Sequence, residues 1–120
     1  MKHPESHAQP LVVQWLRKRG IHFCAIPNGG KRGPIAGRIL KAEGVVAGAP
    51  DIMIFDRPPA RPECVGVALE MKAPDGTKPS KVQLDFLWAL DKRGWAVVIA
   101  YGAHEAFDAL AKLGFGGLPK

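Results

Sequence analysis

The chain has 120 residues and a formal net charge of +6, from 17 lysines and arginines against 11 acidic residues. This length is sufficient for a single hydrophobic core, so we expect one domain over residues 1–120. The chain has no signal-peptide pattern and no run near the ~18 apolar residues of a membrane span, which favours a cytoplasmic protein, and its basic charge favours a polyanionic partner.

The cysteines Cys24 and Cys64 are far apart in the sequence and do not have the spacing of a zinc site. We interpret both as buried thiols of a protein in a reducing compartment. The histidines also lack ligand spacing, so none of them is assigned a chemical role.

The N-terminal part of the chain is predicted to form two helices and a strand. Apolar residues at helical spacing predict a helix over residues 4–19, in which Pro10 either bends the helix or delays its start. A short strand over residues 21–26 follows. A loop rich in glycine and proline over residues 27–34 then leads to a short helix over residues 35–42.

Two apolar runs in the middle of the chain predict an antiparallel strand pair over residues 51–55 and 65–72. Pairing Asp51 with Glu70 places both acids and Lys72 on one face, because side chains alternate along a strand. The opposite face is then entirely apolar and is expected to be buried. It carries Ile52, Ile54, Val67, Leu69 and Met71.

The C-terminal part is predicted to contribute helix, strand and helix. A helix over residues 80–92 begins with Ser80 and Gln83 at the positions of a capping box. Residues 95–101 are strongly apolar, which favours a strand at the centre of the sheet, and residues 103–113 form the last helix. The predicted fold class is α/β, with a mixed β-sheet of about four strands flanked by helices.

Two acids and a lysine on one strand face suit metal-dependent hydrolysis of a phosphodiester. Carboxylate oxygens at Asp51 and Glu70 would hold Mg²⁺ or Mn²⁺, and Lys72 could stabilise the charged transition state. Gly66 and Ala68 are expected to leave this face open. The alternative is structural: Asp51 as an ordinary turn acid, and Glu70 with Lys72 as a solvated ion pair on an edge strand.

Further motifs surround these acids. They are Glu5, PNG at 27–29, LKAEGV at 40–45, AGAPD at 47–51, EMK at 70–72 and SKVQ at 80–83. Together they resemble the virus-type replication-repair nuclease (VRR-NUC) domain of the PD-(D/E)xK nuclease superfamily. The resemblance covers nearly the whole chain and implies a restriction-endonuclease-like fold. It also implies that the protein acts in a bacterial or phage-infected cell.

The resemblance also implies site residues. Asp51, Glu70 and the backbone carbonyl of Met71 would bind the metal, with Glu5 completing the site from the first helix. Lys72 would be the catalytic lysine. The helix glutamine, Gln83, would lie near the metal or the scissile phosphate. Two of these residues also have a structural alternative. Glu5 could be an acid that stabilises the start of a helix, and Gln83 could serve only in the capping box.

The activity implied is cleavage of DNA to 5′-phosphate and 3′-hydroxyl ends. Small members of the family resemble Holliday junction resolvases that act as homodimers, and this is the leading expectation. A nicking, flap or restriction-type nuclease and a non-catalytic DNA-binding accessory protein are the alternatives. The basic residues expected to bind the DNA backbone are Lys31, Arg32, Lys41, Lys78 and Lys81.

The tryptophans are expected to lie in the core, because Trp15, Trp88 and Trp95 each fall on an apolar stripe or in a strand. A candidate dimer contact is a second side of the helix over residues 80–92. It would consist of Leu84, Leu87 and Trp88.

Overall fold

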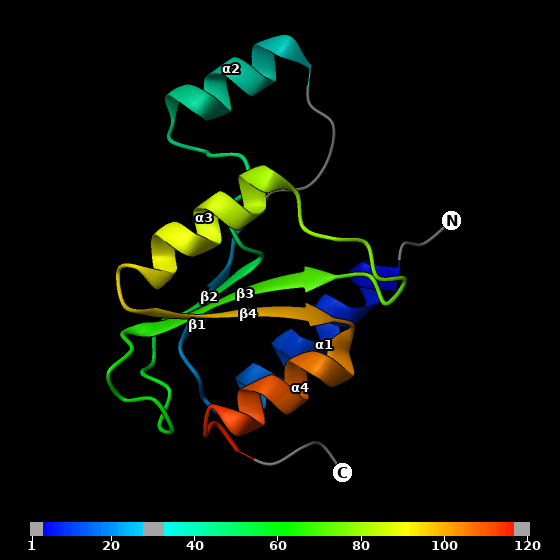
Figure 1. Ribbon diagram of the computed structural model, residues 1–120. Coiled ribbons are helices and arrows are strands. Elements are labelled where there is room, and N and C mark those ends of the chain that lie inside the picture. The colour runs from blue at the N-terminus through cyan, green and yellow to red at the C-terminus, as the bar shows by residue number, and fades with distance from the viewer. Residues whose placement is uncertain (1–3, 28–32, 117–120) are drawn as a thin grey trace.

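The computed structural model describes residues 4–27 and 33–116, and within those ranges the side chains from residue 8 onward. It contains four helices and four strands (Figure 1). In chain order they are α1 (Pro4–Lys18), β1 (Phe23–Ala25), α2 (Pro34–Ala42), β2 (Ile52–Ile54), β3 (Gly66–Lys72), α3 (Lys81–Asp91), β4 (Trp95–Tyr101) and α4 (Ala103–Lys112). Helix α1 continues through Pro10.

The strands form one sheet in the order β1-β2-β3-β4, antiparallel except for β4, which runs parallel to β3. This is the mixed sheet flanked by helices that the sequence predicts. Within it, Ile52 pairs with Leu69 and Ile54 with Val67, so the expected register of the strand pair is confirmed. The same register, extended by one residue, puts Asp51 beside Glu70, directly before the start of β2.

The position of β4 in the sheet differs from the prediction. Residues 95–101 form an edge strand, and β3 occupies the central position between β2 and β4. The prediction was wrong because an edge strand covered on both faces by helices has the same apolar sequence as a central one. Here α3 packs against one face of β4 and α4 against the other.

The helices form layers on both faces of the sheet (Figure 1). Helices α1 and α4 lie together on one face, over the apolar side of β2 and β3, and α3 lies on the other. The first face contains the main core, in which the following side chains are fully buried: Val12, Leu16, Ile52, Ile54, Val67, Leu69 and Leu110. None of these helices, within the described ranges, has the length and apolarity needed to cross a membrane.

Helix α2 is the exception to this layering. It lies beyond α3, on the side away from the sheet (Figure 1). None of its side chains is buried by the described residues, and Ile35 and Ile39 are 68% and 54% exposed. Its apolar residues are therefore available to another surface.

The face of β3 that carries Glu70 is closed, which corrects the expectation that Gly66 and Ala68 leave it open. Both residues are buried. A Cβ atom at Gly66 would collide with the carbonyl oxygen of Ile54 and would lie 2.5 Å from the ring of Trp95. Small residues are needed here because neighbouring groups already occupy the space.

Two predictions of burial are also corrected. Cys24 is exposed, because it lies in β1, a three-residue strand at the edge of the sheet, whereas Cys64 is buried as expected. Trp88 is 54% exposed on the outer side of α3, whereas Trp15 is buried and Trp95 partly buried. The apolar stripe of α3 is wider than the sheet that it covers, so periodicity overestimated its burial.

Replacing Gly66 with alanine is expected to destabilise the protein by about 2 kcal/mol, because the added methyl group overpacks the space between β2 and β4. Gly37→Ala in α2 is the control, since a Cβ atom added at Gly37 would have no described atom within 4 Å. That control should be neutral or stabilising, because alanine favours helix over glycine. Urea unfolding followed by circular dichroism measures both, and equal stability of Gly66→Ala and wild type would contradict the packing.

Candidate active site

Asp51 is fixed at the start of β2 by contacts to both neighbouring strands. Its carboxylate Oδ2 accepts a hydrogen bond of 2.7 Å from the backbone N–H of Met71, and its backbone carbonyl accepts one of 2.8 Å from the N–H of Ile26. The side chain is half-buried. Asp51 therefore does more than end a turn, because it holds a carboxylate against the end of β3.

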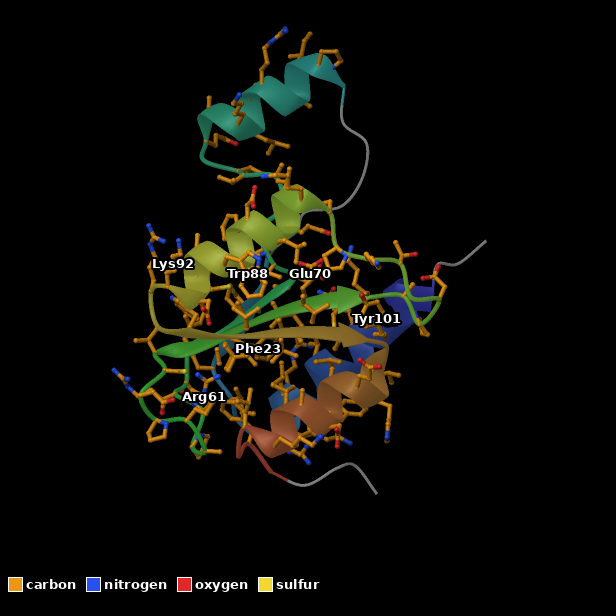
Figure 2. The ribbon with its side chains drawn as sticks, in the orientation of Figure 1. Phe23, Arg61, Glu70, Trp88, Lys92 and Tyr101 are labelled. Carbon is orange, nitrogen blue, oxygen red and sulfur yellow. The ribbon has the colours of Figure 1, made fainter. Side chains whose placement is uncertain are left out.

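Among the described residues, Glu70 is the one charged residue that is buried, with only 2% of its surface exposed. Figure 2 shows it between β3 and α3. Its Oε2 atom accepts a hydrogen bond of 3.1 Å from Nε2 of Gln83. Burying a carboxylate costs free energy unless hydrogen bonds and opposite charge offset the lost solvation, so a buried acid in a small domain indicates a functional site.

Lys72 lies one pleat beyond Glu70 on the same face of β3. Its Nζ atom donates a hydrogen bond of 2.8 Å to Oε1 of Gln83. The Gln83 amide therefore contacts both Glu70 and Lys72 and links them. The surface ion pair considered from the sequence does not describe this arrangement, because Glu70 is buried and β3 is a central strand.

Gln83 reaches both residues because of how α3 begins. Ser80 is the N-cap: its Oγ accepts a hydrogen bond of 3.2 Å from the N–H of Gln83, and its own N–H donates one of 2.9 Å to Oε1 of Gln83. The predicted capping box is confirmed. The structural and site contacts of Gln83 coexist, since its amide makes both sets at once.

The loop that precedes Asp51 packs against the first turn of α3. Gly48 has φ of +86°, and a Cβ atom there would lie 2.7 Å from the carbonyl oxygen of Val82. Only glycine fits both the backbone conformation and this close approach. The contact brings the start of α3 and the chain leading to Asp51 to the same end of β3, which assembles the acids, Lys72 and Gln83.

The other expected metal ligands are placed only in part. Glu5 lies in the first turn of α1, and its side chain falls outside the described side chains. The backbone N–H of Met71 is bonded to Asp51. Among the described residues, no group of three or more histidine, cysteine and acidic side chains is arranged to hold a metal ion. The described carboxylates of the site are Asp51 and Glu70.

This donor set fits a hard divalent cation. Mg²⁺ and Mn²⁺ prefer oxygen ligands, and Mg²⁺ commonly takes only one or two carboxylates from the protein, with water and substrate phosphate supplying the rest. Asp51 and Glu70 belong to neighbouring strands in fixed register. The residues present are therefore compatible with such an ion without a third described acid.

The predicted DNA-binding residues lie on different elements of the fold. Lys78 and Lys81 are exposed on either side of the N-cap of α3, whereas Lys41 is exposed on α2. Lys31 and Arg32 lie outside the described residues. Lys81 also forms an exposed ion pair of 2.7 Å with Asp85, and the hydrogen bond and charge of that carboxylate raise the pKa of the lysine above its usual value.

Sequence reasoning did not identify the hydrogen bond between Asp51 and the N–H of Met71, because a backbone donor leaves no residue-type signal. The bond from the Ser80 N–H to Gln83 belongs to the capping box that the sequence predicts, because that motif directs the Gln83 side chain back to the N-cap N–H.

Comparison with known proteins identifies the fold. The chain is similar to a solved structure named "VRR_NUC domain protein", with a TM-score of 0.70 and 22% sequence identity over 99% of this chain and 95% of that chain. No protein-family model matches the chain, and no curated protein matches it significantly. The chain therefore has the VRR-NUC fold that its motifs indicated.

Asp51→Ala is expected to destabilise the metal-free protein by about 1–2 kcal/mol, because it leaves the buried N–H of Met71 without its acceptor. Asp51→Asn should change stability by less than about 0.5 kcal/mol, because the asparagine oxygen can still accept that bond. Urea unfolding in EDTA compares the two variants. A wild-type-like Asp51→Ala would contradict the role of this hydrogen bond.

Proposed function

We propose that the protein is a metal-dependent DNA endonuclease that cuts branched DNA as a homodimer, in the manner of a Holliday junction resolvase. The observation that carries the proposal is the buried Glu70 carboxylate, which is joined to the Lys72 ammonium through Gln83 at one end of a VRR-NUC sheet. A protein that only binds DNA gains nothing from a buried acid beside a phosphate site, since the two repel each other.

The proposed metal is Mg²⁺ or Mn²⁺, held by Asp51, Glu70, the carbonyl of Met71 and Glu5. When bound, the ion would lower the pKa of a water molecule and neutralise charge on the phosphate. Asp51 and Glu70 act as preorganised ligands because hydrogen bonds already fix both carboxylates. No large rearrangement is then needed to form the site.

Lys72 supplies the positive charge at the reacting phosphate. Its ammonium has three protons, and the bond to Gln83 uses one of them. The remaining protons can bind phosphate oxygens or a water molecule as negative charge develops in the transition state. Gln83 keeps this ammonium at the site before DNA arrives.

DNA binding is proposed to depend on phosphate contacts. Lys78 and Lys81 lie on either side of the N-cap of the helix that carries Gln83, and Lys41, Lys31 and Arg32 would extend the contact surface. The formal charge of +6 supports such binding without base recognition. The proposed enzyme would act in the cytoplasm of a bacterial or phage-infected cell, as its resemblance to VRR-NUC domains implies.

The proposed dimer would use α2. The apolar residues Ile35 and Ile39 are exposed there, as are Val45 and Val46 just after the helix. A nine-residue helix has little stability in isolation, so a covering surface would stabilise it. A two-fold axis would also place two active sites for paired cuts. In the other candidate surface, on α3, Leu87 is 0% exposed and is not available for a contact, whereas Trp88 is 54% exposed.

The direct test is cleavage of a labelled four-way junction, compared with linear duplex, splayed-arm and flap DNA, in Mg²⁺, Mn²⁺ or EDTA. Paired, symmetric and metal-dependent cuts in the junction are expected. Cutting of flaps or duplex instead would discard the resolvase assignment and keep the nuclease. Tight binding without cutting in either metal would favour a DNA-binding accessory protein.

Glu70→Gln and Lys72→Met are each expected to reduce the cleavage rate at least about 100-fold, while junction binding in Ca²⁺ changes little. Glutamine preserves the shape of Glu70 and methionine preserves the apolar stem of Lys72, so the fold should survive. Lys92→Met is the matched control, since Lys92 is exposed at the other end of α3. Full activity of Glu70→Gln would show that the site is assigned incorrectly.

Replacing exposed apolar residues of α2 with charged residues should separate the subunits of the proposed dimer. The double variant Ile35→Asp with Ile39→Asp is expected to sediment as a monomer in analytical ultracentrifugation and to lose paired cutting of junctions, because the apolar contact becomes repulsive. Leu11→Asp is the control, since Leu11 is also half-exposed but lies on α1, across the sheet. An intact dimer in the double variant would exclude α2 as the interface.

A further inference from the structure

The side-chain amide of Gln83 binds hydrogen-bond donors through its oxygen and an acceptor through its nitrogen. Its oxygen accepts hydrogen bonds from the N–H of Ser80 at 2.9 Å and from Nζ of Lys72 at 2.8 Å. Its nitrogen donates to Oε2 of Glu70 at 3.1 Å. An amide oxygen has two lone pairs, and the two donors use both.

Only one orientation of this amide satisfies its neighbours. If the amide were reversed, its NH₂ group would face the Ser80 N–H and the Lys72 ammonium, so donors would face donors. Its oxygen would then face the Glu70 carboxylate, so acceptors would face each other. The mismatch is most costly at the Glu70 end, because that carboxylate is 2% exposed and little water is present to relieve it.

The partners of the amide differ in what they do during a reaction. When phosphate binds, Lys72 would replace its hydrogen bond to Gln83 with one to phosphate, and Glu70 would likewise turn to the metal. The Ser80 N–H belongs to the backbone and stays in place. The Ser80 hydroxyl helps to hold that backbone, because it caps the N–H of Gln83 at 3.2 Å. The Ser80 N–H is therefore the permanent anchor of the amide oxygen.

We propose that Ser80 is a positioning residue, whose backbone N–H fixes the orientation of the Gln83 amide and thereby holds Lys72 and Glu70 in their reactive arrangement. This inference rests on the proposed nuclease function for its effect on rate. Without the anchor, the amide could rotate when Lys72 engages phosphate and would present its NH₂ group to the returning ammonium.

Two substitutions at Ser80 separate the N–H from the hydroxyl. Ser80→Ala removes the cap and keeps the N–H. Ser80→Pro removes both, and the backbone accepts it because Ser80 has φ of −70°, close to the value that proline fixes. Both variants lack the cap, so a difference between them reports on the N–H.

In the otherwise wild-type chain, Ser80→Pro is expected to cleave junction DNA about tenfold more slowly than Ser80→Ala at saturating DNA, with unchanged DNA affinity. In a Gln83→Ala background, the two Ser80 variants should cleave at equal rates, because Ser80 acts only through the amide. A purely structural role would give the same ratio in both backgrounds, and that result would overturn the proposal.

Amide hydrogen exchange at Ser80 tests the anchor without any cleavage. Gln83→Ala should accelerate exchange at the Ser80 N–H at least about tenfold, because it removes the acceptor while the cap remains. Lys72→Met should leave this exchange unchanged. An unprotected Ser80 N–H in the wild type would overturn the proposal. If the wild type cleaves no DNA, the nuclease function fails, and the exchange comparison still decides whether the amide is anchored.

Discussion

The burial of the Glu70 carboxylate is the constraint on which the arrangement of this protein depends. Glu70 lies on the central strand, with helices over both faces of the sheet, and is 2% exposed. A carboxylate in that position needs hydrogen-bond donors and positive charge close by. The Gln83 amide supplies a donor, and Lys72 brings an ammonium to the other end of the same amide. The beginning of α3 is thereby tied to the end of β3.

The rest of the site follows from bringing α3 to this position. Gly66 lacks a side chain where β2 and Trp95 leave no room for one, and Gly48 allows the preceding loop to approach the backbone of Val82. That loop leads directly to Asp51, whose carboxylate bonds to the N–H of Met71. Close packing at Gly48 and the polar contacts of Gln83 therefore depend on each other, because a shift of α3 would disturb both.

The sequence predicted the parts of this site that depend on strand periodicity. Asp51, Glu70 and Lys72 were placed on one face from the alternation of side chains, and the register of β2 and β3 is the one expected. The order of strands was less predictable, since β4 is apolar on both faces whether it is central or at an edge. Cys24 shows the same limit, because burial depends on which elements cover a residue, and local sequence does not specify that.

The residues of the candidate active site and the lysines proposed to bind DNA differ in how firmly the fold holds them. The acids, Lys72 and Gln83 lie on strands or at a helix start and are held by hydrogen bonds, which would suit the metal site proposed for them. Lys41, Lys78 and Lys81 are exposed on a projecting helix, in a loop and at a helix end. In the proposed DNA complex, such lysines would neutralise phosphates without imposing a sequence or a shape. If the proposed dimer forms, the spacing of its two sites would be the source of any preference for branched DNA.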